Sequence, residues 1–188
     1  MPTHVALLRG INVGGRNRVA MTDLRGVVAS LAHTDVATYI QSGNVVFTSP
    51  ETDTTAIAAA LERAITESLS ARCTVVVLSC DELRHVVVGN PWPGEMNHKC
   101  LHVAFTSEQI RPDQLATIAA AQQRATDKGS PDEARVVGRT LFLHTPDGLG
   151  RSELTAQLAR AGGPLAAAGS ATVRNWATVT KLLAMCQA

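Results

Sequence analysis

Apolar positions in the first half of the chain alternate between strand-like and helix-like patterns. Residues 4–9 (HVALLR) form a short apolar run typical of a buried strand, and apolar residues at helical spacing follow over residues 21–31. Two β-rich runs then flank Ser42-Gly43, a pair that favours a two-residue hairpin turn. One apolar stripe predicts a helix over residues 57–69, and CTVVVLS predicts a strand over 73–79. The first half therefore predicts the order β-α-β-β-α-β.

The second half repeats this order after a short helix predicted over 81–88 and a joint rich in proline and glycine (GNPWPGEMNHK). Its predicted elements are a strand at 100–106, a helix at 112–122, a hairpin that turns at Gly138-Arg139, a helix at 150–161, a short strand at 171–174 and a final helix at 175–185. We therefore expect an α+β fold of two tandem ferredoxin-like (β-α-β-β-α-β) plaits with an added C-terminal helix. The expected boundaries are 1–88 and 100–188, with the joint at 89–99.

The composition is that of an ordinary globular protein, with 45% hydrophobic and 18% charged residues. A length of 188 residues allows one compact domain or two small ones. The net charge of +1 argues against a broad nucleic-acid-binding surface. A local basic patch exists nevertheless, because Arg9, Arg16 and Arg18 lie in the first 22 residues, which contain no Asp or Glu.

Cysteine usage and hydropathy bear on the location of the protein. The four cysteines form no CxxC pair, so the sequence indicates neither a zinc site nor a thioredoxin-like motif. No signal peptide and no apolar run of membrane-spanning length is visible. We therefore expect a cytoplasmic protein with reduced thiols and no membrane association. Nothing in the sequence indicates an oligomeric state.

The segment RGINVGGRN, residues 9–17, places glycines, arginines and asparagines between a predicted strand and a predicted helix. A right-handed crossover makes the first two strands parallel, so this loop and the hairpin tip at 41–44 are expected at the same edge of the sheet. A two-residue turn sets Gln41 opposite Asn44 and Tyr39 opposite Val46, all on one face.

This composition predicts an anion-binding pocket. Glycines allow backbone N–H groups to turn inward, arginines bind phosphate or carboxylate, and amides recognise the neutral part of a ligand. The candidate ligand-binding residues are Arg9, Gly10, Asn12, Gly14, Gly15, Arg16, Asn17, Tyr39, Gln41, Ser42 and Asn44. The alternative is structural, with glycines that only close a tight β-α turn. The loop contains neither a Walker A motif nor GxGxxG, so it predicts no particular nucleotide or cofactor.

Two further constellations have both a structural and a functional interpretation. Arg174, Asn175 and Trp176 lie at the start of the last predicted helix, with Asn175 as a suitable N-cap. Trp176 is expected to pack that helix onto the sheet, and the alternative is a base-stacking platform flanked by Arg174. Arg151 and Ser152 open another helix, where a serine N-cap is the simpler interpretation and an anion site is the alternative.

The sequence predicts no metal site and assigns no catalytic residue or cofactor. His98, Cys100 and His102 alternate along a predicted strand, a spacing that fits zinc or copper, but no fourth ligand accompanies them. Ser42 lacks the Gly-x-Ser-x-Gly of a nucleophile elbow. Asp23 has no visible partner for acid–base catalysis.

The motifs VALLRGINVGGRNRVAMTDLR and VATYIQSGNVVF closely resemble the bacterial family catalogued as domain of unknown function 1697. The resemblance continues through NPW at 90–92 and HVAFT at 102–106, and it resumes with RSEL and ATVRNWATVTKLL near the end. It implies a duplicated ferredoxin-like architecture and no established activity, substrate or cofactor. The chain departs from the family at Ala177, where a polar residue often follows the tryptophan.

Three classes of function follow from these observations. The leading hypothesis is a small cytoplasmic protein that binds a phosphate-bearing ligand, a nucleotide or a nucleic-acid end, with Arg9 and Arg16 on the phosphate. The second is an enzyme that uses the same pocket, with Tyr39 or Asp23 as proton carrier. The third is an interaction module whose glycine loop contacts a partner chain. The near-neutral charge and few aromatic residues argue against binding of extended nucleic acid.

Overall fold

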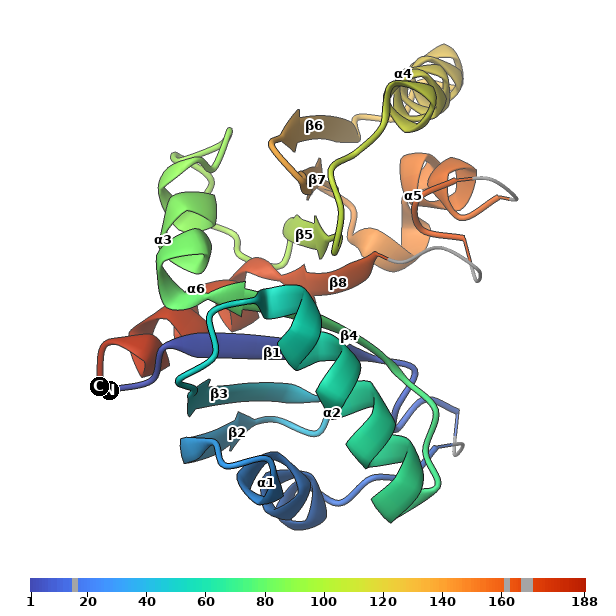
Figure 1. Ribbon diagram of the computed structural model, residues 1–188. Coiled ribbons are helices and arrows are strands. Elements are labelled where there is room, and N and C mark those ends of the chain that lie inside the picture. Colours follow the sequence, from blue (N-terminus) through green and yellow to red (C-terminus); the bar gives the residue numbers. More distant parts are fainter. Residues whose placement is uncertain (15–16, 161–162, 167–170) are drawn as a thin grey trace. The chain divides into compact units, whose positions relative to one another are not determined.

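In the computed structural model, the described residues are 1–14, 17–160, 163–166 and 171–188. The predicted site residues Gly15 and Arg16 lie outside the described residues. The chain divides into two compact units, one of residues 1–85 with 180–188 and the other of residues 86–179. Figure 1 shows the helices and strands of both units.

The first unit contains a four-stranded sheet with two helices on one face (Figure 1). Its elements are β1 (His4–Arg9), α1 (Met21–Ser30), β2 (Thr34–Tyr39), β3 (Asn44–Thr48), α2 (Thr54–Leu69), β4 (Thr74–Ser79) and the first part of α3 (Cys80–Val88). The strand order is β2-β3-β1-β4, and every neighbouring pair is antiparallel. Leu24 of α1 and Leu61 of α2 pack with Phe47 of β3 in the core between helices and sheet.

The second unit contains another four-stranded antiparallel sheet, in the order β6-β7-β5-β8. Its elements are β5 (Leu101–Phe105), α4 (Pro112–Asp127), β6 (Glu133–Val137), β7 (Thr140–His144), the 3-10 helix η1 (Leu149–Arg151), α5 (Glu153–Leu158), β8 (Thr172–Asn175) and the first residues of α6 (Trp176–Cys186). Ile118 of α4 and Leu154 of α5 pack with Leu141 of β7. Ser152 Oγ accepts a bond from Thr155 N at 2.9 Å, which confirms the predicted serine N-cap.

The chain is a mixed α+β protein with two four-stranded antiparallel sheets and, in its described part, six α-helices. The predicted C-terminal helix is present as α6. Helix α4 extends beyond the predicted end to Asp127, because Ala125 continues the buried stripe of Ile118 and Ala121. None of the described helices combines the length and hydrophobicity needed to span a membrane.

The predicted register of the hairpin between β2 and β3 is wrong. Tyr39 pairs with Asn44, so neither predicted pair, Gln41 with Asn44 or Tyr39 with Val46, forms. The connection is a four-residue turn that starts at Ile40, whose backbone is left-handed (φ 49°). Asn44 Nδ2 donates to Tyr39 O at 3.0 Å and closes this turn. The longer turn moves the pairing by two residues and keeps the buried face of β3 unchanged.

A disulfide between Cys80 and Cys186 corrects the expectation of four reduced thiols. Cys80 begins α3 and Cys186 ends α6, and their Cα atoms lie 5.9 Å apart, within the usual range for a disulfide. The two residues are 106 positions apart in the sequence, and no local spacing signals such a pair. Cys73 and Cys100 carry free thiols.

Two buried histidines flank Phe47 in the first unit. The Phe47 ring lies 4.8 Å from the His33 ring and 5.8 Å from the His4 ring. His4 and His33 are only 4% and 8% exposed, and no hydrogen-bond partner for His33 Nδ1 occurs among the described residues. Burial lowers the pKa of both histidines. His33 lowers the pKa of His4 further, whereas Glu82 and Glu51 act in the opposite direction.

We expect the first unit to lose stability as the pH falls below the ordinary histidine pKa of about 6.5. In that range the unfolded chain binds protons that the buried His4 and His33 rings bind only at lower pH. The free energy of unfolding therefore falls until the pH passes the lowered pKa values. Thermal unfolding measured from about pH 8 to about pH 5 checks this. His33→Phe keeps an aromatic ring beside Phe47 and should flatten the decline; a decline identical to wild type would assign it to other groups.

Candidate functional site

The end of β1, the end of β2 and the start of β3 lie at one edge of the first sheet. Both β1 and β2 run antiparallel to β3, so they are parallel to each other and end at the same edge. Asn12 Nδ2 donates to Gln41 O at 2.8 Å, and Leu8 N donates to Gly43 O at 2.8 Å. The predicted convergence of the loop after β1 with the hairpin tip is therefore confirmed. We call this region, residues 9–14, 17–20, 39–44 and 70–73, the loop edge.

Asn12 ties the loop both to the hairpin tip and to its own far end. Besides Gln41 O, its Nδ2 donates to Val19 O at 3.0 Å, and its Oδ1 accepts from Val19 N at 2.9 Å. Its backbone is left-handed (φ 54°), a conformation that asparagine adopts more readily than most residues. Both amide hydrogens of Asn12 are used within the chain, so this side chain builds the loop.

Asn17 and Asn44 also hold the loop edge together. Asn17 Nδ2 donates to Gly10 O at 2.9 Å and to Arg72 O at 3.0 Å, which joins the loop to the segment before β4. Asn44 is fully buried and donates to Tyr39 O across the hairpin. Asparagine side chains therefore connect the loop, the hairpin tip and the segment before β4.

Glycines are placed at the loop edge for two different reasons. Gly10 and Gly14 have left-handed backbones, with φ of 87° and 58°. Gly43 is left-handed as well (φ 74°), and a Cβ atom at this position would lie 2.7 Å from Leu8 Cβ and 2.8 Å from Ile11 Cδ1. The hairpin tip thus packs directly against β1 and the loop, at a separation that only glycine allows.

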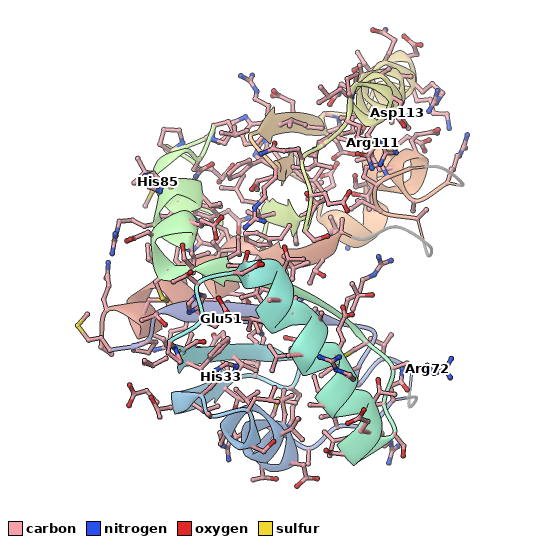
Figure 2. All side chains as sticks on the ribbon, in the orientation of Figure 1. His33, Glu51, Arg72, His85, Arg111 and Asp113 are labelled. Carbon is pink, nitrogen blue, oxygen red and sulfur yellow. A yellow bond between two sulfur atoms is a disulfide. The ribbon has the colours of Figure 1, made fainter. Side chains whose placement is uncertain are left out.

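Three described arginines belong to the loop edge. Arg9 ends β1 and is half-buried, and Arg18 is exposed directly after Asn17. Arg72 is exposed, its carbonyl oxygen accepts from Asn17, and Figure 2 shows its side chain at the outer end of the sheet. Arg72 was not predicted, because it lies 55 positions from Asn17 in a connector without a motif. The pairing of β4 with β1 sets Thr74 beside Arg9 and thereby brings Arg72 to the loop edge.

The remaining predicted ligand residues lie at the hairpin tip. Gln41 and Ser42 are exposed, and Tyr39 is half-buried. Ser42 Oγ already accepts a hydrogen bond within the turn, at 2.9 Å. Two aliphatic side chains accompany them at the surface, Ile40 with 51% and Val13 with 68% exposed. The loop edge therefore presents cationic, amide and aliphatic groups together.

The second predicted constellation, at the start of α6, is largely built into the fold. Asn175 Oδ1 accepts from Thr178 N at 2.8 Å, which confirms Asn175 as an N-cap. Trp176 is only 6% exposed, so little of its ring is accessible for stacking. Burial lowers the pKa of Arg174 to about 10, and its Nη1 donates to Val173 O at 2.9 Å.

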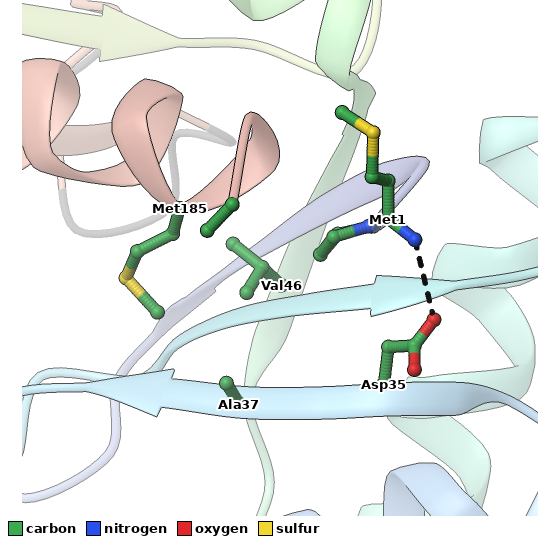
Figure 3. A pocket seen from close by; sticks show the side chains of 7 residues that line it. Met1, Asp35, Ala37, Val46 and Met185 are labelled. Atoms are coloured by element: carbon green, nitrogen blue, oxygen red, sulfur yellow. Dashed lines mark ion pairs between the residues drawn. The ribbon is translucent and has the colours of Figure 1, made fainter.

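A pocket of about 300 Å³ lies elsewhere in the first unit, beside β2, β3 and the end of α6 (Figure 3). Met1, Val46 and Met185 give it apolar walls, and Asp35 adds a carboxylate. Asp35 Oδ2 lies 3.7 Å from the N-terminal nitrogen and accepts from Thr48 Oγ1 at 2.8 Å. Asp35 is near the start of β2, toward the edge opposite the loop edge. An apolar pocket with an acidic side chain does not favour a phosphate.

Comparison with known proteins identifies the family of the chain. A model described as "Protein of unknown function (DUF1697)" matches residues 1–142, which include the whole loop edge. The chain belongs to the DUF1697 family. No curated protein matches it. The conserved bacterial protein SP0830 from Streptococcus pneumoniae has a similar structure, with 23% sequence identity, a TM-score of 0.73 and 98% of each chain covered. At this identity the likeness shows the fold alone.

Two kinds of reactive group in this DUF1697 chain bear on its chemistry, metal-ligating side chains and free thiols. Its described part contains no group of three His, Cys, Asp or Glu side chains placed to hold a metal ion, so His98, Cys100 and His102 form no such site. Burial, assisted by Glu62, raises the pKa of Cys73 to about 11. Burial also raises the pKa of Cys100. Neither free thiol is therefore activated as a nucleophile.

Proposed function

We propose that this DUF1697 protein binds a phosphate-bearing ligand, a nucleotide or a nucleic-acid end, at the loop edge. The observation that carries the proposal is that the backbone segments with Arg9, Arg18 and Arg72 meet at the loop edge, where Asn17 bonds to the carbonyl oxygens of Gly10 and Arg72 and where Gly10 and Gly14 have left-handed backbones. A guanidinium group binds phosphate oxygens through two parallel N–H bonds, which makes arginine suited to such a site. Backbone N–H groups in a glycine-rich turn bind anions as well.

The asparagines and the arginines have different roles in this proposal. Asn12 and Asn17 use their amide hydrogens on carbonyl oxygens of the chain and hold the loop in shape. Contact with the ligand falls to the arginines, with Gln41 and Tyr39 beside its neutral part. Arg16, predicted from the sequence, is a further phosphate-binding candidate.

The start of α1 supports the same ligand. The N-cap of this helix is Ala20, whose side chain has no acceptor for the N–H groups of the first turn. A phosphate near these groups gains from their hydrogen bonds and from the positive end of the helix dipole. Asp23 in the same turn opposes this attraction in part.

A thermal-shift screen tests the proposal. Wild type and an Arg9→Ala/Arg18→Ala/Arg72→Ala variant are compared in the presence of nucleotides, short oligonucleotides, phosphosugars and carboxylates. A ligand at about a hundred times its Kd stabilises the folded state by about 2.7 kcal/mol. We expect one phosphate-bearing class to raise the Tm of wild type and to leave that of the triple variant unchanged.

Arg84→Ala is the matched control for this screen. Arg84 is exposed on α3, which follows the far end of β4, and it pairs with Asp81. Arg84→Ala should leave the ligand-induced rise in Tm as large as it is in wild type. A shift that survives the triple substitution would place the site elsewhere, and no shift of wild type by any compound would contradict the proposal. If binding weakens steeply with added salt, the proposed ligands include nucleic acid.

We also propose that each unit is a ferredoxin-like plait and that the chain arose by duplication. In both sheets the strands of a unit follow the order second, third, first, fourth, with antiparallel neighbours throughout. This order is the one expected from a β-α-β-β-α-β plait. The repeat is one of structural pattern and not of residue identity.

A further inference from the structure

A tryptophan in the second unit lies over the sheet with a cation beside it. The Trp92 ring is stacked on the His144 ring, with centroids 5.4 Å apart and planes inclined by 28°. Arg135 Cζ lies 5.4 Å from the Trp92 ring centroid. His144 and Arg135 share one face of the sheet, because Glu133 pairs with His144 and Arg135 follows two positions later. Trp92 therefore lies against this face of the sheet, in contact with side chains of both β6 and β7.

Hydrogen bonds tie the segment that carries Trp92 to itself and to β7. Asn90 Oδ1 accepts from Trp92 N at 3.0 Å, and Trp92 O accepts from Glu95 N at 3.1 Å. Glu95 Oε2 lies 2.8 Å from His144 Nε2, which ties the segment to β7. The backbone N–H of Asn97, followed by His144, lowers the pKa of Glu95, so this carboxylate is charged at neutral pH. A ligand on Trp92 would meet a ring that is already ordered.

The surroundings of Trp92 are open to solvent. Trp92 is itself partly exposed, and the Arg135 side chain is 57% exposed. Met96, next to Glu95, is 88% exposed, and Val137, on the same face of β6 as Arg135, is 46% exposed. Exposed apolar side chains therefore lie on both segments that form the contact between Trp92 and Arg135, as they do on many binding surfaces.

We propose that Trp92 and Arg135 form a second binding site, for a nucleobase that carries a phosphate. The exposed part of the indole ring stacks on the base, an interaction that every base can make. The exposed guanidinium of Arg135 binds the phosphate. A nucleotide, free or within a single strand, carries both groups. This site belongs to the second unit and does not depend on the loop edge.

Tryptophan fluorescence reports binding at this site. The chain has two tryptophans, and because Trp176 is buried, the ligand-dependent change is expected from Trp92. The full chain is titrated with AMP, adenosine, inorganic phosphate and a short oligothymidylate. We expect saturable quenching by AMP or the oligothymidylate, weaker binding of adenosine, and no quenching by phosphate alone. Quenching by AMP indicates a free nucleotide, and quenching by the oligothymidylate alone indicates a single strand. Trp92→Phe should remove the signal.

Arg135→Gln should weaken binding about tenfold, the change that 1.4 kcal/mol produces. Arg111→Gln is the matched control and should bind as wild type does. Arg111 is 59% exposed and paired with Asp113 at 3.0 Å, much as Arg135 is paired with Glu133 at 3.2 Å.

Three results would overturn this second site. The first is that neither AMP nor the oligothymidylate quenches the fluorescence. The second is equal affinity for adenosine and AMP. The third is an equal loss of affinity in Arg135→Gln and Arg111→Gln. The Arg9→Ala/Arg18→Ala/Arg72→Ala variant should retain full quenching. Failure of the loop-edge proposal and failure of this one are therefore separately observable.

Discussion

Replacing Gly43 by alanine should destabilise the first unit by about 2–5 kcal/mol. The left-handed backbone (φ 74°) costs an alanine about 1–2 kcal/mol. The new Cβ would also stand 2.7 Å from Leu8 Cβ and 2.8 Å from Ile11 Cδ1, and overpacking of this kind costs about 1–3 kcal/mol. Leu8 and Ile11 are buried, so neither can move aside without displacing β1 or the loop.

Gly138→Ala provides the matched control for this prediction. Gly138 also turns a hairpin with a left-handed backbone (φ 59°), but a Cβ there would meet none of the described atoms within 4 Å. Its substitution should cost only the backbone term, about 1–2 kcal/mol. Urea unfolding followed by circular dichroism measures both variants. Equal losses of stability in Gly43→Ala and Gly138→Ala would show that the close approach of the hairpin tip to β1 adds nothing to the cost of the substitution.

Asn12→Ala should also be strongly damaging, with a loss of about 1.5–4.5 kcal/mol from its hydrogen bonds and a further loss from backbone strain. It removes the bonds to Gln41 O, Val19 O and Val19 N, each of which contributes about 0.5–1.5 kcal/mol. Alanine is also strained at the left-handed φ of 54°. Without these bonds the loop is no longer tied to the hairpin tip, so ligand-induced stabilisation at the loop edge should fall as well.

Asn12→Gly separates the two contributions. Glycine accepts the left-handed backbone but supplies no amide, so this variant should lose less stability than Asn12→Ala and lose ligand binding to a similar degree. Urea unfolding and the ligand thermal shift are measured on both variants. If Asn12→Ala proves as stable as wild type, Asn12 does not hold the loop edge.

The succession of helices and strands was readable from the sequence, for local reasons. Ile57, Leu61 and Ile65 repeat at helical spacing, and HVALLR is a short apolar run, so each element carries its own signal. The meeting of the loop with the hairpin tip followed from the crossover connection, which leaves the first two strands parallel. That rule needs only the order of elements and no knowledge of their contacts.

Features that depend on contacts outside a single helix or strand could not be predicted from the sequence. The turn at Ile40 is longer than Ser42-Gly43 alone suggests, because the side chain of Asn44 closes it from the next strand. Arg72 belongs to the loop edge only through Asn17 and the pairing of β4. The partners of Trp92 come from β6 and β7, far along the chain, and no motif announces them.

Glycine amide signals test the loop-edge proposal most directly. In ¹H–¹⁵N spectra of the full chain, titration with inorganic phosphate and with AMP should shift the signals of Gly10 and Gly14 in a saturable manner. Gly26, on the exposed side of α1, and Gly129, after α4, serve as references and should not move. Gly10 and Gly14 signals that stay unchanged, or that shift no more than those of Gly26 and Gly129, would contradict an anion site at the loop edge.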